Sequence, residues 1–331
     1  MKTYNLTFLL LLFYSVSTAQ QDSVYHAPSQ FDSVRSMNMA GPVTKVVLKS
    51  TDGGKTWQDL SKGLPNNWEA IDLFCNQTGL YVSTGNRIYH NKPNSSTPQW
   101  ANEISPDNHS NIAPGKAGMY AFNWDGQFLQ KRNGTTEWSP QFKNFPDKEI
   151  RSVFETAAGT LFICTNSRIY KSTNNGKTWK EVHRGDWTIK LAESNGVLMA
   201  TSGNGIIMSV DDGETWKIVL NEGGVGIDIA PIRGGFAAIT FNTLANVRTV
   251  KATYDGGKTW NSIDAGLPPH LNTASIIQVG DDFLCGHPNG IYRSSDNGKT
   301  WKLVVASPVD KVFKLYVSGN VIYAVARNEG C

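Results

Sequence analysis

The chain has little charge of either sign, few cysteines and one long apolar run. Charged residues make up 18% of its 331 residues, and 31 basic against 28 acidic side chains give a formal net charge of +3. Lys and Arg form no cluster that would bind a nucleic acid or hold the protein on a membrane surface. Composition therefore argues against both of these partner classes.

Cysteine is too scarce and too widely spaced for a disulfide framework. The four residues are Cys75, Cys164, Cys285 and Cys331, and none combines with His in a spacing typical of zinc sites. Cys164 and Cys285 hold equivalent positions in a repeat described below, three units apart, so they should lie far apart in space. We expect small buried thiols at Cys75, Cys164 and Cys285, with no bound metal and no cofactor.

The long apolar run lies at the start of the chain. Lys2 precedes an apolar stretch from Leu6 to Val16, and Ser17–Ala19 supplies the small residues found at signal-peptide cleavage sites. The run is too short to span a bilayer. We expect a signal peptide, an N-terminal segment and a folded domain at residues 1–19, 20–42 and 43–331. Such a protein would be exported to the periplasm, the cell surface or the medium.

An octapeptide that ends in tryptophan is repeated along the rest of the chain. Five copies share the pattern Ser/Thr-x-Asp/Asn-x-Gly-x-Thr-Trp and end at Trp57, Trp179, Trp216, Trp260 and Trp301. Two degenerate copies end at Trp100 and Trp138. Seven units at a period of about 40 residues are typical of a repeat protein with one continuous core.

Each unit contains the signals of four short strands. Runs of Val, Ile, Tyr and Phe are broken by Gly and Asn, a pattern typical of strands and hairpins rather than helices. In the fourth unit the strands are predicted at residues 150–156, 160–165, 168–172 and 178–182. Four-stranded units at this period are typical of propeller blades.

The two ends of the folded domain supply complementary halves of one further blade. Residues 43–49 resemble a third strand with nothing before it, whereas residues 312–317 and 321–326 resemble a first and a second strand with nothing after them. The sequence therefore predicts an all-β protein, a seven-bladed β-propeller of four-stranded blades. Its ring would be closed by pairing of the N-terminal and C-terminal strands.

The octapeptide resembles the Asp-box, or BNR repeat, and residues 43–327 resemble Asp-box β-propellers. An Asp or Asn side chain can accept hydrogen bonds from backbone N–H groups of a turn. Gly permits a positive φ angle, and Trp supplies an apolar body that can pack between blades. These roles explain every fixed position, so we expect the boxes to be structural rather than to bind calcium or sugars. The key residues are Asp52, Trp57, Asn174, Trp179, Asp211, Trp216, Asp255, Trp260, Asp296 and Trp301.

Binding residues are expected on the face opposite the boxes. The resemblance places the boxes between third and fourth strands, so this loop face consists of turns between second and third strands and loops that lead into first strands. Loops on a rigid scaffold often carry binding residues. The candidates are Trp124, Arg87, Arg168, His287 and Trp187. The alternatives are inter-blade packing for Trp187, solvated arginines, and an ordinary loop histidine at His287.

Catalysis is the second functional hypothesis. Sialidases with Asp-boxes have six blades, bind the substrate carboxylate with three arginines, and use a Tyr–Glu pair and an Asp. Their Arg-Ile-Pro motif is absent, because Arg87-Ile88 and Arg168-Ile169 are each followed by Tyr. Xyloglucan-cleaving glycosidases with this repeat use two propellers, whereas this chain supplies one. We therefore assign no catalytic residue, and a sialidase-like exo-glycosidase remains the alternative.

A non-catalytic role agrees better with the layout of the chain. The photosystem II assembly and stability factor is a single seven-bladed Asp-box propeller that binds a protein partner, and the resemblance covers nearly the whole mature chain. The resemblance implies a protein partner, and we expect that a protein or a glycan is bound on the loop face without turnover. Adhesion, scaffolding and assisted assembly all agree with this interpretation.

Overall fold

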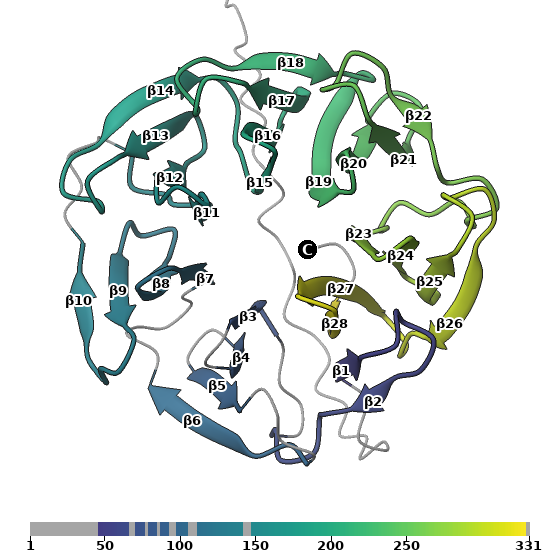
Figure 1. Ribbon diagram of the computed structural model, residues 1–331, viewed down its shortest axis with the longest axis horizontal. Coiled ribbons are helices and arrows are strands. Elements are labelled where there is room, and N and C mark those ends of the chain that lie inside the picture. Colours follow the sequence, from purple (N-terminus) through teal and green to yellow (C-terminus); the bar gives the residue numbers. More distant parts are fainter. Residues whose placement is uncertain are drawn as a thin grey trace, which may run out of the picture. The chain divides into compact units, whose positions relative to one another are not determined.

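The computed structural model describes residues 46–65, 70–76, 79–84, 87–92, 97–104, 111–141 and 147–328. Within these ranges, 28 strands form seven four-stranded antiparallel sheets. The same ranges contain no helix that could cross a membrane. The sheets are the blades of a ring (Figure 1), which confirms the predicted all-β, seven-bladed propeller. The predicted signal peptide and N-terminal segment lie outside the described residues.

The blades are numbered here by the order of their Asp-box units, so that blade 1 closes the ring and blades 2–7 begin with β3, β7, β11, β15, β19 and β23. The innermost strands are β27 (Lys311–Ser318), β3 (Asp72–Asn76), β7 (Asn111–Gly115), β11 (Ser152–Glu155), β15 (Leu191–Ser194), β19 (Gly224–Ile232) and β23 (Ser275–Val279). The second strands are β28 (Val321–Asn328), β4 (Gly79–Ser83), β8 (Gly118–Phe122), β12 (Leu161–Cys164), β16 (Val197–Ser202), β20 (Gly235–Asn242) and β24 (Asp282–His287).

The remaining strands complete each blade outward. The third strands are β1 (Val47–Ser50), β5 (Arg87–Asn91), β9 (Phe128–Arg132), β13 (Arg168–Ser172), β17 (Gly205–Ser209), β21 (Val247–Thr253) and β25 (Gly290–Ser294). The outermost strands are β2 (Gln58–Asp59), β6 (Trp100–Ile104), β10 (Trp138–Pro140), β14 (Lys180–Arg184), β18 (Lys217–Leu220), β22 (Asn261–Ser262) and β26 (Lys302–Ala306).

Blade 1 joins the two ends of the described chain. Its strand order is β2-β1-β28-β27, and β1 pairs with β28 in a register that places Leu48 opposite Ala324. A hydrogen bond from Arg293 Nε in blade 7 to the carbonyl oxygen of Gly53 (3.1 Å) adds a further contact across the closure. The predicted pairing of N-terminal and C-terminal strands is confirmed.

The fourth strand of blade 4 begins later than predicted. The sequence pattern predicts a strand at residues 178–182, whereas β14 spans Lys180–Arg184. The difference arises because Thr178 still belongs to the box turn, where its N–H donates to Asn174 Oδ1 at 2.9 Å.

Each of the five complete boxes is held together by its Asp or Asn side chain. In the first box, Asp52 Oδ1 accepts hydrogen bonds from the N–H groups of Lys55 and Thr56, both at 3.0 Å, and Oδ2 accepts from Thr56 Oγ1 at 2.6 Å. Ser50 Oγ accepts from the N–H of Gly54 at 2.9 Å. Asp211, Asp255 and Asp296 accept equivalent hydrogen bonds. In blade 4 the amide of Asn174 replaces the carboxylate and donates from Nδ2 to Thr178 Oγ1 at 2.8 Å.

The fixed glycine of the box touches the preceding blade. Gly54 has a φ of 80°, and a Cβ atom placed there would lie 2.3 Å from a side-chain carbon of Leu284 in blade 7. Gly213 has the same relation to Phe162 in blade 4, at 2.4 Å. A residue without a Cβ is therefore required both by the turn and by the contact between blades.

The tryptophans pack at the interfaces between blades and use their indole N–H in two ways. Trp57, Trp179 and Trp216 donate to the carbonyl oxygen of the glycine in their own box, at 3.0–3.1 Å. Trp100, Trp260 and Trp301 donate to a carbonyl oxygen of the preceding blade, at 2.8–3.0 Å. Both arrangements satisfy the indole N–H while its apolar rings add to the core.

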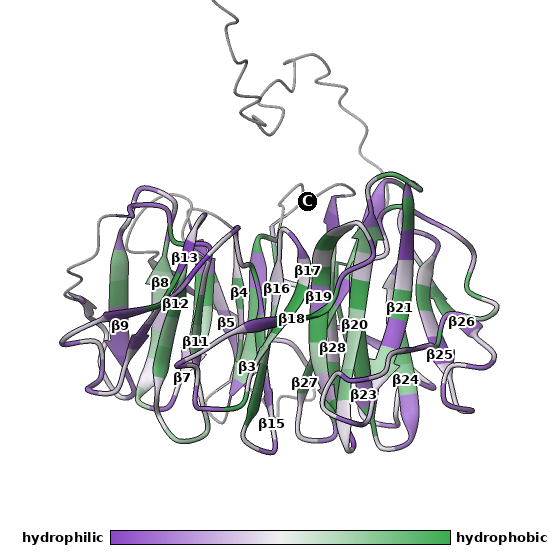
Figure 2. Cartoon of the chain, turned by 90° about the horizontal axis from the view of Figure 1, so that it is seen from above, coloured by the Kyte–Doolittle hydropathy of each residue, from purple (hydrophilic) through white to green (hydrophobic). Residues whose placement is uncertain are grey.

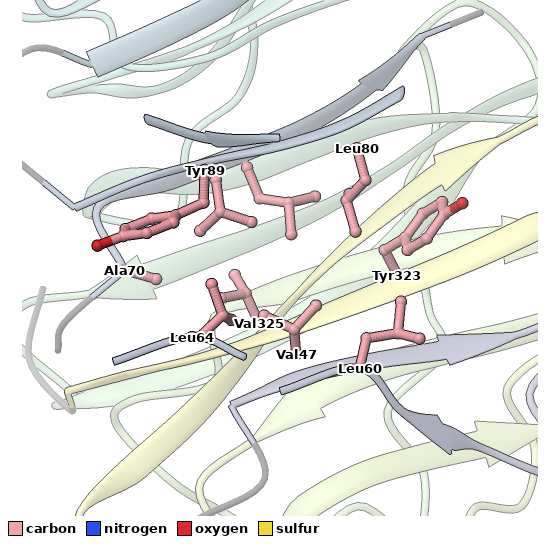
Figure 3. Close-up of a cluster of buried hydrophobic side chains, with 10 residues drawn as sticks. Val47, Leu60, Leu64, Ala70, Leu80, Tyr89, Tyr323 and Val325 are labelled. Carbon is pink, nitrogen blue, oxygen red and sulfur yellow. The ribbon is translucent and has the colours of Figure 1, made fainter. Parts of the chain in front are cut away.

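The core is divided into seven clusters, one at each interface between neighbouring blades. The cluster between blades 1 and 2, drawn in Figure 3, combines Val47 and Val325 from the closing blade with Leu80 and Tyr89 from blade 2. In Figure 2 apolar colouring follows many of the strands, whereas several of the loops that connect them are hydrophilic. The two sides of a blade are thus buried against its two neighbours.

Three of the cysteines lie in the described part of the chain and are free thiols. Cys164 and Cys285 are fully buried as expected, whereas Cys75 is only partly buried. Burial raises the pKa of Cys164 to about 12, so this thiol stays protonated at neutral pH.

The box hydrogen bonds predict a defined loss of stability in acid. Hydrogen bonds from Thr259 lower the pKa of Asp255 to about 2 from its ordinary 3.8. Because the folded state favours the carboxylate, its contribution should be complete above the ordinary pKa and lost as the pH falls towards 2. Thermal unfolding of wild type and Asp255→Asn from pH 2 to 7 should show a constant difference in Tm above about pH 5.

The difference in Tm between wild type and Asp255→Asn should become smaller below about pH 4, because residue 255 titrates only in the wild type. Titration of the other boxes affects both proteins equally and does not change the difference. Asn is the matched substitution, because Asn174 already fills this position in blade 4. A difference in Tm that stays constant down to pH 2 would show that the carboxylate charge contributes nothing to the turn.

Candidate functional site

A cavity of about 600 Å³ lies at the centre of the ring. Residues from all seven blades line it, because each innermost strand turns its unpaired edge toward the propeller axis. Trp124, in the turn between β8 and β9, and Arg151, just before β11, place its mouth on the loop face, opposite the boxes.

The cavity lining is strongly basic. Its five basic side chains are Arg151, Lys190, Arg248, Lys314 and Arg327, and its two acidic side chains are Asp72 and Asp228. The resulting excess of three positive charges equals the formal net charge of the whole chain, +3. This concave site therefore carries an excess of positive charge, and walls of low dielectric constant strengthen its field.

Asp228 joins three blades beneath this basic lining. Its Oδ1 lies 2.5 Å from Lys190 Nζ of blade 5, and its Oδ2 accepts a hydrogen bond of 2.9 Å from the N–H of Ile276 in blade 7. Only 3% of the Asp228 side chain is exposed, against 33% for Lys190. The carboxylate is therefore neutralised and hydrogen-bonded within the fold.

Asp72 plays a similar part between blades 2 and 1. Its Oδ1 accepts a hydrogen bond of 2.8 Å from the hydroxyl of Tyr316, and Lys314 Nζ lies 3.9 Å from the same oxygen. Burial raises the pKa of Tyr316 well above its usual value and lowers that of Lys314. Tyr316 therefore remains a neutral hydrogen-bond donor at physiological pH.

Three arginines line the cavity without an ion pair in the part of the chain that the structure describes. Among the described residues, no Asp or Glu oxygen forms an ion pair with Arg151, Arg248 or Arg327. The guanidinium carbon of Arg151 lies 5.2 Å from the ring centroid of Trp124, a cation–π contact. Burial lowers the pKa of Arg248 to about 10. The arrangement suits recognition of an anion.

Of the five residues predicted from the sequence, Trp124 lines the cavity and the other four do not. Arg168 forms ion pairs with Asp147 and with Glu181, the latter at 3.1 Å, and these contacts raise its pKa. His287 is fully buried, with Nε2 2.9 Å from the carbonyl oxygen of Pro268 and Nδ1 accepting from the N–H of Asn289 at 3.0 Å.

The two remaining predicted residues lie away from the cavity. Arg87 is exposed at the start of β5, and Trp187 is partly buried in the segment before β15. Sequence reasoning selected turn residues and missed the side chains of the innermost strands. The available signal was a charged residue at or just before the start of a first strand, as with Asp72 and Lys190, or within an otherwise apolar one, as with Asp228.

Comparison with family models identifies two features of the chain. Residues 48–59 and 292–303 match the BNR/Asp-box repeat, and residues 115–223 match the DUF6242 beta propeller domain. The repeat matches contain the box turns of blades 1 and 7, and the domain match runs from the end of β7 to just before β19.

A curated relative is the probable oligoxyloglucan-reducing end-specific xyloglucanase of Neosartorya fischeri, 22% identical over 77% of this chain. The chain spans 26% of the length of that protein. Among solved structures, YCF48 bound to D1 peptide has a TM-score of 0.57 and 14% identity, covering 80% of this chain and 95% of that one. Virginiamycin B lyase from Staphylococcus aureus has a TM-score of 0.59 and 13% identity, covering 85% and 98%. These structural likenesses show the fold alone.

The contacts of Asp228 predict a large effect of its removal. Asp228→Ala should lower the free energy of unfolding by about 3 kcal/mol, because the buried N–H of Ile276 and the charge of Lys190 both lose their partner. Denaturant unfolding measures the change. Asp281→Ala is the control, since its ion pair with Arg233 is exposed on both sides and should change stability by less than about 0.5 kcal/mol. Equal effects of the two variants would contradict the structural role of Asp228.

Proposed function

The chain is an Asp-box β-propeller, and we propose that it acts as an exported, non-catalytic module that binds a protein partner on its loop face. Export rests on residues 1–19, which have the pattern of a signal peptide. Binding rests on the central cavity and its rim. A glycan is the alternative ligand of the same face.

The observation that carries this proposal is the position of Trp124. Its side chain is 60% exposed at the mouth of the cavity, and the guanidinium of Arg151 lies over its ring. Trp and Arg are the side chains most enriched among interface residues that dominate binding energy. Ile189, also on the cavity wall and 38% exposed, extends the apolar rim. A partner that covers this rim would bury an aromatic surface that water now contacts.

The comparisons add support of two kinds. YCF48, a propeller of nearly the same extent, was solved with a bound peptide of D1, so this architecture serves peptide binding in another protein. The xyloglucanase relative is about four times as long as the aligned region, so its activity does not transfer with the part that this chain matches.

Trp124→Ala tests the proposal. The change should leave Tm nearly unaltered, because exposed substitutions usually shift stability by less than about 0.5 kcal/mol. It should weaken binding of the partner by about 2 kcal/mol or more, roughly 30-fold in Kd. Partners would be captured by cross-linking in the native envelope, and their Kd then measured with purified proteins.

Val210→Ala is the matched control, since Val210 is 65% exposed in the box turn between β17 and β18, on the face opposite the proposed site and outside the cavity lining. It should leave both Tm and Kd unchanged. A partner whose Kd is insensitive to Trp124→Ala would contradict the proposed site. A marked fall in Tm of the Trp124 variant would show that the indole stabilises the fold instead.

Glycoside hydrolysis is a second candidate, favoured by one observation. The hydroxyl of Tyr316 hydrogen-bonds to Asp72 in a cavity that three arginines also line. Sialidases combine a Tyr–carboxylate pair with three arginines, as noted above. Burial keeps Tyr316 protonated, however, and Asp72 accepts its hydrogen bond rather than approaching solvent as a free base. We therefore keep hydrolysis as the alternative.

A panel of fluorogenic glycosides, sialosides included, separates the two candidates. The folded protein should show no turnover between pH 4 and 8 if it only binds. Turnover that disappears in Tyr316→Phe or Asp72→Asn would establish catalysis and overturn the binding proposal. The two variants retain the shape of the cavity, and their Tm should be measured alongside activity.

A further inference from the structure

We infer that Arg248 anchors a subsite for a carboxylate group in the central cavity. The inference rests on the proposed function, because it assigns a ligand chemistry to the same cavity. The carboxylate could belong to an acidic residue of a bound polypeptide or to a small free acid, and the experiment below distinguishes these sources.

The side chain of Arg248 has one N–H group that donates a hydrogen bond and one buried N–H group without an acceptor among the described residues. It comes from β21, the third strand of blade 6, and its side chain reaches the cavity, where Nη1 donates to the carbonyl oxygen of Thr273 at 2.6 Å. Its Nε is buried and has no hydrogen-bond acceptor among the described residues. A buried polar N–H without an acceptor costs free energy that the rest of the fold must offset.

Within the described part of the chain, no carboxylate forms an ion pair with Arg248. Both acidic residues of the cavity already have partners, since Asp228 binds Lys190 and the N–H of Ile276, and Asp72 binds the hydroxyl of Tyr316. The lowered pKa of Arg248 has burial as its cause, with no nearby carboxylate opposing it. A charge that is removed from water without a counter-charge destabilises the folded state. A bound anion would supply that counter-charge.

Other basic side chains of the cavity also favour the binding of an anion. Arg327 and Lys314 line the same cavity, and the positive charges of Arg327 and Lys190 help to lower the pKa of Lys314. Arg327 forms no ion pair with any described Asp or Glu. An anion bound beside Arg327 and Lys314 would relieve the repulsion between these two cations.

A carboxylate on an apolar body fits the cavity best. Phe74, Phe154 and Ile227 form part of the wall, so a ligand must bury apolar surface next to the cations. The planar guanidinium matches a carboxylate in shape and charge. A group with one negative charge also loses less hydration on entry than a doubly charged phosphate.

Arg248→Met tests the inference with two readouts. The substitution keeps most of the aliphatic stem and removes the charge, so the free protein should have a Tm equal to or above that of wild type. The same variant should bind a carboxylate roughly tenfold more weakly or worse, because it loses a charged hydrogen bond. Arg327→Gln gives a second, independent loss of affinity, and Arg233→Gln is the control, because Arg233 is exposed outside the cavity.

The probes are benzoate, with benzamide as its neutral counterpart, and the capped peptide acetyl-Gly-Glu-Gly-amide, with Gln in place of Glu as its counterpart. Binding is followed by calorimetry and by the ligand-induced rise in Tm of the full chain, at matched ionic strength. Binding of benzoate but not benzamide supports a small free acid, and selective binding of the Glu peptide supports an acidic residue of a polypeptide. In both cases Arg248→Met should abolish most of the effect.

Other results would overturn the inference. These are no preference for either acidic probe over its neutral counterpart, affinity that is unchanged in Arg248→Met, or a large fall in Tm of the free Arg248→Met protein. The last would show that Arg248 is a structural link to Thr273. The proposed function is tested apart from this, since a protein partner that depends on Trp124 but is insensitive to Arg248→Met would leave that function standing while this inference fails.

Discussion

The fold depends on apolar contact between neighbouring blades. Each blade is a four-stranded sheet that has two sides to bury, and each interface holds one cluster of the core. No blade can satisfy this requirement alone, and in an open row the two end blades would each leave one side in water. Closure through β1 and β28 removes those ends. The Asp-boxes serve the same interfaces, because their glycine and tryptophan both touch the preceding blade.

Closing a ring of seven blades leaves a cavity at its centre. The innermost strands cannot meet on the axis, so their edges surround a cavity whose polar groups need partners. Asp72 and Asp228 supply some by joining adjacent blades. Among the described residues, Arg151, Arg248 and Arg327 form no ion pair with a carboxylate. A rigid ring keeps these cations close together, whereas in a looser structure they would move apart. Because the site is pre-organised in this way, less free energy is lost when an anion binds.

The architecture could be predicted from the sequence because its signals are local in the chain, whereas most of the site could not, because its residues come from separate repeats. The box turn is local: Asp255 and the residues it contacts lie within four positions of one another, so the pattern is visible in the chain. Closure could be predicted because each terminal segment lacked strands that the other supplied. The cavity brings together residues such as Asp72, Lys190 and Lys314, which come from separate repeats. Trp124 was the exception, since an aromatic residue in a tight turn is conspicuous in the sequence itself.

The pairing of β1 with β28 also sets the order of events during biosynthesis. Strand β1 leaves the ribosome early, yet its partner spans Val321–Asn328, more than 270 residues later. Until those residues emerge, blade 1 is a two-stranded fragment and both flanking clusters stay exposed to water. The nascent chain therefore cannot complete its core progressively, blade by blade. Folding has to finish after translation of β28, and a chain interrupted before that strand would offer an unpaired edge for aggregation.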